Sequence, residues 1–268
     1  MNKNSKIARL FLGSTYLFLY IPILFLIIFS FNKGSSLRTW EGFSFIWYQK
    51  LFAHHELWIA LTNSLKVAFL SATNAVIIGL LCALWFVRFR HFRFTSWMEA
   101  LSVTPLVLPE VLAGLAFLFF FVLTERFLNW PMGRGLLTIT IAHTTIAVAY
   151  VTLVLRSRLL ELDGDLEEAA LDLGAKPRDI FFSITLPMLF PSLLASWVLA
   201  FTLSMDDLVI ASFTSGPASP TLPIVVFSTL KTGLTPEMNA LSTLIVLFVI
   251  ALAPLSSLFL YRTFKKRP

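Results

Sequence analysis

Three carboxylic acids interrupt stretches of the sequence that are otherwise apolar. Glu110 follows Pro109 in one long apolar stretch, and Asp206 and Asp207 stand together near the end of another. An acid inside a bilayer costs about 2.5–3.5 kcal/mol on insertion scales and by default marks a transport path. These side chains would compensate positive charge, so we predict that they line the path of a cation. Alternatives stay open for both sites. Glu110 would be a protonated acid or one bonded to a neighbouring helix, and Asp206 and Asp207 would be a helix-end pair in the outer headgroups.

Catalytic chemistry finds little support. The sequence lacks the G-x-x-x-x-G-K-[S/T] loop that binds ATP phosphates, and it lacks H-E-x-x-H and G-x-S-x-G. His54, His55 and Glu56 are a conceivable metal cluster, but adjacent helical positions point apart, which favours a polar outer loop. His143 lies inside an apolar stretch, where a histidine is either functional or bonded to another helix. We predict a protein that is not an enzyme and has no catalytic or metal-binding residues.

The segment from residue 163 to 187 reads as a short helix, a corner and a second helix. Asp165 is suited to the N-cap, and Glu168 three residues later completes a capping-box pattern. Gly174 is suited to the C′ position and Pro177 to the start of the next helix. Its apolar residues share one helical face: Leu166, Ala169, Ala170 and Leu173. Membrane-surface helices are usually basic with large apolar residues, so this acidic helix with small residues favours docking on a partner protein.

The overall composition indicates that membrane-spanning helices position these residues. The chain has 268 residues, of which 57% are hydrophobic and only 13% are charged. An ordinary soluble domain has about 25% charged residues, and a disordered chain has few apolar ones. One cysteine, Cys82, excludes a disulfide framework within the chain. The sequence therefore predicts an all-α integral membrane protein.

Six apolar runs are long enough to span a bilayer, which takes about 20 residues. We expect a single transmembrane domain over residues 1–268 with a core of about 59–261, because the loops are too short to form a second domain. A short apolar stretch, Leu222–Leu230, predicts a helix at the outer face. The six predicted spans are approximately Leu10–Ser30, Ile59–Val87, Glu99–Leu123, Leu136–Leu155, Ile184–Met205 (with a possible extension to Phe213) and Leu241–Tyr261.

The distribution of basic residues predicts the orientation. Fourteen Lys and Arg lie at the termini and in the loops after the second and fourth runs, against seven at the other ends of the spans. The positive-inside rule then places both termini in the cytoplasm, together with the loop of about residues 156–183. This topology accounts for the net charge of +6 without nucleic-acid binding.

The cytoplasmic loop resembles a known family. Glu168-Ala169-Ala170, followed at fixed spacing by Gly174 and by Ile184-x-Leu-Pro, is similar to the EAA signature of ABC importer permeases. The resemblance implies a type I ABC importer permease fold of six transmembrane helices in a bacterial inner membrane. It also implies that Glu168, Ala169, Ala170 and Gly174 form the coupling element, which docks on a cytoplasmic ATPase subunit. ATP and Mg²⁺ would then be bound by that partner, with no cofactor on this chain.

A similarity that runs through most of the chain, and is densest from about residue 156 to 245, indicates the substrate class. The segment from Thr202 to Pro217, which contains Met205-Asp206-Asp207, resembles spermidine/putrescine permeases and is most similar to the second permease subunit of the putrescine system. This implies a polyamine importer made of this chain, a homologous second permease subunit, two ATPase subunits and an extracytoplasmic substrate-binding protein. A permease for another cation or small solute, such as ferric ion or an amino acid, is the alternative. A membrane enzyme or a passive channel fits the sequence less well.

Overall fold

The computed structural model of this chain is helical, apart from one isolated β-bridge between Asn32 and Phe43 among the described residues. It describes residues 3–36, 39–233 and 235–265. The chain divides into two compact units. One combines the N-terminal segment up to Leu57 with the C-terminal segment from Val226, and the other runs from Trp58 to Val225.

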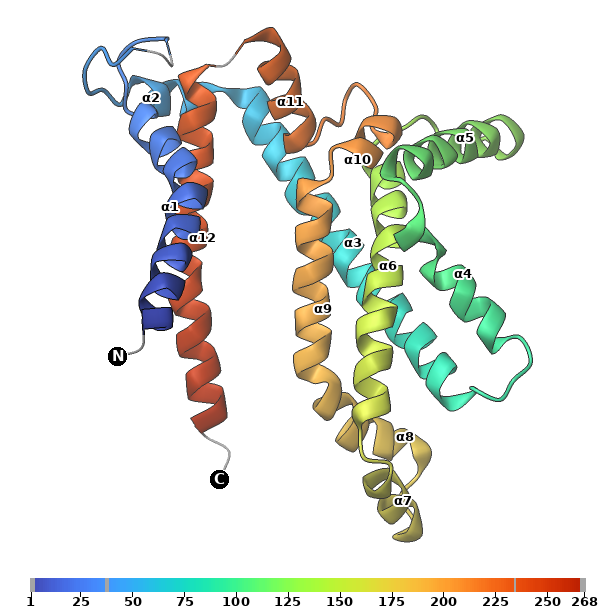
Figure 1. The fold of residues 1–268 in the computed structure, drawn as a ribbon. Helices are drawn as coiled ribbons and strands as arrows, with labels where there is room; N and C mark the ends of the chain where they lie inside the picture. The colour runs from blue at the N-terminus through green and yellow to red at the C-terminus, as the bar shows by residue number, and fades with distance from the viewer. Residues whose placement is uncertain (1–2, 37–38, 234, 266–268) are drawn as a thin grey trace. The chain divides into compact units, whose positions relative to one another are not determined.

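The first unit pairs the two ends of the chain. Helix α1 (Lys3–Phe29) lies against α12 (Pro236–Lys265), and α12 also contacts α2 (Ile46–Ala53). Figure 1 draws α1 and α12 side by side, in blue and red. In the connection after α1, the Asn32 side chain donates to the carbonyls of Ser36 and Thr39 and accepts the Glu41 N–H. Asn32 is fully buried, and these three bonds give both ends of its side-chain amide a partner, as a buried polar group requires.

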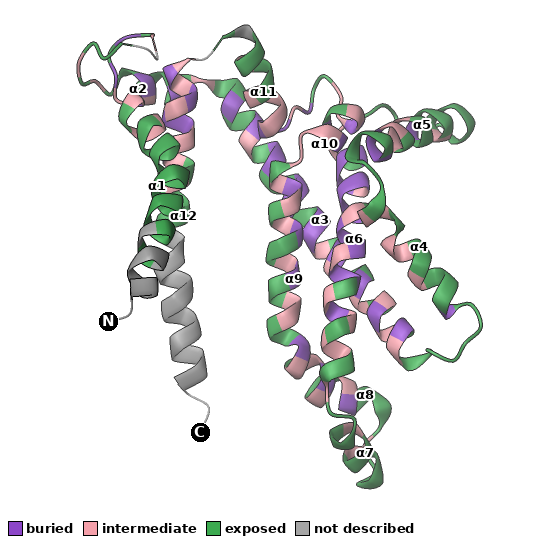
Figure 2. Cartoon of the chain, in the orientation of Figure 1, coloured by how far each residue is buried: buried purple, intermediate pink, exposed green. Residues whose placement is uncertain are grey.

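The second unit is a helical bundle. Its core lies where α3 (His55–Arg88), α6 (Leu136–Glu161) and α9 (Leu186–Asp206) meet. Small residues let these backbones approach closely; the buried cluster consists of Ala72, Ala75, Ala83, Ala147, Val151, Leu155 and Ala200. Figure 2 shows buried residues concentrated on α3 and α6 and exposed ones along α5 (Glu110–Leu128). Apolar helices that expose much of their surface are typical of a protein surrounded by lipid.

Five helices in the described part of the chain are long and apolar enough to cross a membrane. They are Phe11–Phe29, His55–Arg88, Glu110–Leu128, Leu136–Glu161 and Pro177–Asp206. The sixth predicted span falls on α12, whose described side chains end at Ile250 and form a shorter apolar stretch, so a count of six stays a prediction. Lys266 and Arg267, two of the predicted cytoplasmic charges, lie outside the described residues.

The third predicted span, about Glu99–Leu123, is divided into two helices. It consists of α4 (Thr95–Val107) and α5, separated by Leu108 and Pro109 in extended conformation, with ψ of 134° and 133°. Proline disfavours helical geometry in the preceding residue and has no N–H for the helix ladder. The Pro109 carbonyl instead accepts the first N–H bonds of α5, from Leu112 and Ala113. Glu110 therefore begins a helix rather than lying within one.

The fifth predicted span ends at Asp206, and the possible extension to Phe213 is a separate helix, α10 (Val209–Thr214). The Asp207 carboxylate caps α10, because its Oδ1 accepts the N–H groups of Ile210 at 2.9 Å and Ala211 at 3.2 Å. The predicted short helix over Leu222–Leu230 is confirmed as α11 (Leu222–Thr232), while its place at the outer face stays a prediction. Its first N–H donates to the Ser64 hydroxyl at 2.8 Å, which ties α11 to α3.

Candidate functional site

Glu110, Asp206 and Asp207 line one cavity of about 450 Å³. They arrive from separate parts of the chain: Glu110 from the start of α5, and the two aspartates from the end of α9 and the turn into α10. Each acid stands at an interruption in a helix. The two breaks described above therefore bring the three carboxylates together, as a common substrate path would require.

The rest of the cavity wall is mainly apolar. Among the residues that the structure describes, the lining includes no Lys, Arg or His. Besides the three acids it consists of Pro105, Leu106, Leu108, Pro109, Ala113, Ile146, Tyr150, Leu203, Leu208, Val209 and Ile210. Carboxylates attract ammonium groups, aliphatic walls accommodate methylene chains, and an aromatic ring such as that of Tyr150 attracts cations. This chemistry suits an organic cation with an alkyl backbone.

A buried histidine stands behind the aspartates. His143, with 3% of its side chain exposed, has Nδ1 2.7 Å from the Ser204 hydroxyl. Its Nε2 lies 3.7 Å from Asp207 Oδ2 and has no hydrogen-bond partner within the described part of the chain. Of the two readings open for His143, the bond between helices is confirmed, and the ring also faces a cavity acid. Ser204 was missed by the sequence analysis, although it lies one helical turn before Asp207.

The predicted helix–corner–helix segment is confirmed. Helix α7 (Asp165–Asp172) ends before Gly174, whose φ of +84° is readily adopted only by glycine. The Ala175 N–H donates to the Ala170 carbonyl at 3.0 Å and closes the corner. Pro177 begins α8 (Pro177–Ile180), which continues through the π-helical turn η1 (Phe181–Thr185) into α9.

The predicted N-cap at Asp165 is wrong. Gly164 occupies that position, and the Asp163 carboxylate accepts the Asp165 N–H at 3.1 Å. The helix begins at Asp165 because the preceding aspartate provides the acceptor. Glu168 remains in the first turn of α7, where the helix dipole favours acids.

Three of the four predicted docking residues, Glu168, Ala169 and Ala170, lie on the accessible surface of α7. None of its eight residues is buried, and Glu168 and Ala169 are exposed. Leu173 at the helix end is 88% exposed. An exposed apolar stripe on a helix without buried residues is available to a partner. The neighbouring Glu167 was missed by the sequence analysis and instead faces the membrane-spanning helices.

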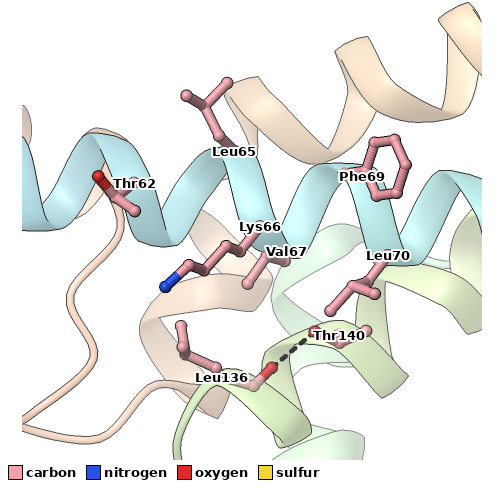
Figure 3. Close-up of a pocket in the computed structure, with 8 residues that line it drawn as sticks. All are labelled: Thr62, Leu65, Lys66, Val67, Phe69, Leu70, Leu136 and Thr140. Atoms are coloured by element: carbon pink, nitrogen blue, oxygen red, sulfur yellow. Dashed lines mark hydrogen bonds between the residues drawn. The ribbon is translucent and has the colours of Figure 1, made fainter.

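A second hollow, between α3 and α6, has a different character. It holds about 420 Å³ and is lined by apolar residues together with Thr62, Thr140 and Lys66. Figure 3 shows the Lys66 side chain extending from α3 on the side where Leu136 of α6 lies. Lys66 is the one charged residue among the described residues of this wall, so the hollow does not suit a cation.

The possible metal cluster at His54 is not formed. His54 Nδ1 lies 2.7 Å from Glu237 Oε1, a contact between α12 and the chain just before α3. No group of three or more His, Cys, Asp or Glu that could hold a metal ion occurs among the residues the structure describes.

Solved structures first define the class of this fold. A bacterial ABC transporter involved in the import of the acidic polysaccharide alginate matches with a TM-score of 0.70, over 96% of this chain and 98% of that chain at 16% identity. The inward-facing MetNI methionine ABC transporter matches with a TM-score of 0.55, over 81% and 97% at 16% identity. The chain therefore has a fold that occurs in ABC transporters.

Sequence relatives then give the family. Residues 75–268 match the family described as "Binding-protein-dependent transport system inner membrane component", and this chain belongs to that family. The putrescine transport system permease protein PotI of Escherichia coli K12 is 48% identical over 90% of this chain and 85% of that protein. The spermidine/putrescine permease PotC of Haemophilus influenzae is 38% identical, over 92% and 94%. The resemblance stated from the EAA signature is thus confirmed.

Proposed function

We propose that this chain is a permease subunit of an ATP-driven importer for polyamines such as putrescine and spermidine. The observation that carries the proposal is the convergence of Glu110, Asp206 and Asp207 on one cavity with apolar walls. A polyamine carries ammonium groups separated by methylene chains, so carboxylates and aliphatic walls are the complementary surface. The names of the relatives, putrescine and spermidine/putrescine permeases, support the same substrate class.

The translocation path would be completed by a homologous second permease subunit. In this proposal the chain crosses a bacterial inner membrane six times as one transmembrane domain of the type I importer fold, with both termini in the cytoplasm. An extracytoplasmic binding protein delivers the polyamine to the outer loops. The carboxylates replace water as partners of the ammonium groups inside the membrane, which lowers the barrier to passage.

ATP hydrolysis would take place on two cytoplasmic ATPase subunits, with ATP and Mg²⁺ bound there. Helix α7 docks on one of them through Glu168, Ala169 and Ala170, and the Gly174 corner sets its angle to α8. The exposure of this helix and its match to the EAA spacing support the assignment. Movement of the ATPases then switches the path between outward and inward access.

Uptake of radiolabelled putrescine and spermidine tests the proposal, in cells that lack their own polyamine importers. The chain is co-expressed with its partner subunits, and Glu168→Lys serves as the docking-defective variant. We expect ATP-dependent uptake that Glu168→Lys abolishes. A complex that hydrolyses ATP but imports neither polyamine would contradict the substrate assignment and direct the search to ferric ion or amino acids. Flux independent of ATP would contradict the importer itself.

A further inference from the structure

Helix α7 is attached to the membrane-spanning helices by Glu167, the residue immediately before the predicted docking triplet. The Thr185 hydroxyl donates to Glu167 Oε1 at 2.5 Å. Arg88 Nη2, at the end of α3, lies 3.3 Å from the other carboxylate oxygen. One carboxylate therefore joins α7, η1 and α3.

Apolar packing contributes little to this attachment. No residue of α7 is buried, and Leu166 in its first turn is 48% exposed. Hydrogen bonds to an ionised group are stronger and more directional than neutral ones. Thr185 is 1% exposed, so the hydroxyl end of this bond lies inside the bundle, whereas the Glu167 side chain is 35% exposed. The position of α7 on the bundle thus depends on Glu167 more than on a hydrophobic contact.

Thr185 occupies a special place in the chain. It is the last residue of η1, where the Leu186 N–H donates to the carbonyl of Phe181, five residues back. Pro187 explains the wide turn, since its ring would collide with the carbonyl four residues earlier in a regular α-helix. Such π-turns occur frequently at functional sites.

Helix α9 connects the Glu167–Thr185 bond to the cavity that Asp206 and Asp207 line. It follows Thr185 directly and ends at Asp206 after 21 residues, a length of about 31 Å at 1.5 Å per residue. The Glu167–Thr185 bond is therefore at one end of α9, and Asp206 and Asp207 are at the other. A displacement of α7 that reaches Thr185 acts on the helix that carries two of the cavity acids.

We propose that Glu167 is the positioning residue that transmits the movement of α7 to α9, while the adjacent Glu168 faces the ATPase. The inference rests on the proposed docking of α7. When the ATPase moves α7, the Glu167–Thr185 bond carries the start of α9 with it, and Arg88 holds the carboxylate in place. Loss of this bond leaves α7 docked but weakly connected to the cavity.

The test uses the complete transporter reconstituted in vesicles, with ATP hydrolysis and putrescine uptake measured together. Glu167→Gln and Thr185→Val each remove the bond from one side. We expect uptake per ATP hydrolysed to fall about tenfold in each, within the usual range of coupling between sites, while ATP hydrolysis persists. The double variant should match the single ones, because both remove the same bond. Asp172→Asn, at the exposed end of α7, is the control and should leave the ratio unchanged.

Hydrogen–deuterium exchange of the same complex without substrate gives a second measure. Glu167→Gln should speed exchange of the α7 amides about tenfold through easier local opening, and Asp172→Asn should not. Unchanged exchange, or an unchanged ratio of uptake to hydrolysis, would overturn the proposal. Loss of assembly and ATP hydrolysis in both bond-removing variants would assign Glu167 a structural role instead and also overturn it. If the unmodified complex hydrolyses ATP without importing putrescine, the substrate assignment fails, and the exchange result still decides the role of Glu167.

Discussion

His143 on α6 and Ser204 on α9 share a hydrogen bond of 2.7 Å inside the bundle. The bond joins two helices that pack along the core of the second unit. Because Ser204 lies one turn before Asp207, the bond also sets the ring of His143 3.7 Å from the Asp207 carboxylate. The helix core and the wall of the acidic cavity therefore share one polar link.

Ser204→Ala should destabilise the bundle. It leaves a ring nitrogen of His143 without its partner, and an unsatisfied buried polar group costs about 1–3 kcal/mol. We expect a lower midpoint of thermal unfolding for the purified complex and weaker polyamine uptake. Ser212→Ala is the matched control, because the exposed Ser212 hydroxyl bonds only to the carbonyl of Leu208 in its own turn among the described contacts. Equal effects of the two variants would show that the hydrogen bond to His143 does not contribute to stability or uptake beyond an ordinary serine hydroxyl.

Glu110→Gln should weaken transport while the complex still assembles. The variant keeps the shape of the side chain but removes one charge from the cavity. If the lost charge-assisted contact contributes about 1.4 kcal/mol to binding, KM rises about tenfold. Initial uptake rates against putrescine concentration measure this shift. Glu56→Gln, an exposed acid in the first turn of α3, serves as the comparison and should leave KM unchanged. Unchanged uptake by Glu110→Gln at low putrescine would remove Glu110 from the path.

Gly174→Ala should impair coupling through backbone strain. Residue 174 has φ of +84°, and a left-handed conformation costs a side-chain-bearing residue about 1–2 kcal/mol. No neighbouring atom would meet the added methyl group, so its volume is not at issue. Gly164, at the other end of α7, has an ordinary φ of −65° and equally open surroundings, so Gly164→Ala isolates the effect of φ.

We expect Gly174→Ala to reduce co-purification with the ATPase and transport, and Gly164→Ala to leave both near normal. Gly174→Asn should lie between them, since asparagine tolerates the left-handed region better than alanine. If the two alanine variants behaved alike, the conformation of the corner would not control docking.

Gly114→Ala should disturb the packing of α5 on α10. A methyl group there would overlap the ring of Phe213, and overpacking of this kind costs about 1–3 kcal/mol. A lower unfolding midpoint is expected, with partial recovery when Phe213→Leu is added to make room. Gly13→Ala on α1 meets no neighbouring atom and should be neutral. Absence of any recovery in the double variant would mean that the Phe213 ring is not the cause.

Features that depend on neighbouring residues were predictable. The α7 helix, the Gly174 corner and the start of α8 at Pro177 follow from local dihedral preferences and hydrogen bonds, and the structure contains all three. Even here the predicted N-cap residue, Asp165, differs from the observed one, Gly164, because Asp163 and Asp165 can both provide a carboxylate near the helix start. Local rules could not choose between two chemically equivalent acceptors.

Features that depend on residues far apart in the sequence could not be predicted from the sequence. Pro105 lies inside α4 while Pro109 separates α4 from α5, although both stand in the same apolar run. Glu167 and Glu168 are adjacent acids, but only Glu167 meets Thr185 and Arg88 among the described contacts. The difference arises because the partner helices come from elsewhere in the chain, and spacing along the sequence does not record which side of α7 they occupy.

The sequence by itself determined the class of this protein: an apolar helical chain, with acids at costly positions and an acidic helix typical of ABC importer permeases. Hydrophobic periodicity and helix-end chemistry are local, so they can be read residue by residue. Only the tertiary structure decided that Glu110 meets Asp206 and Asp207 in one cavity and that His143 stands behind them. Those relationships depend on how α5, α6, α9 and α10 pack, and contacts between segments far apart in the sequence decide that packing.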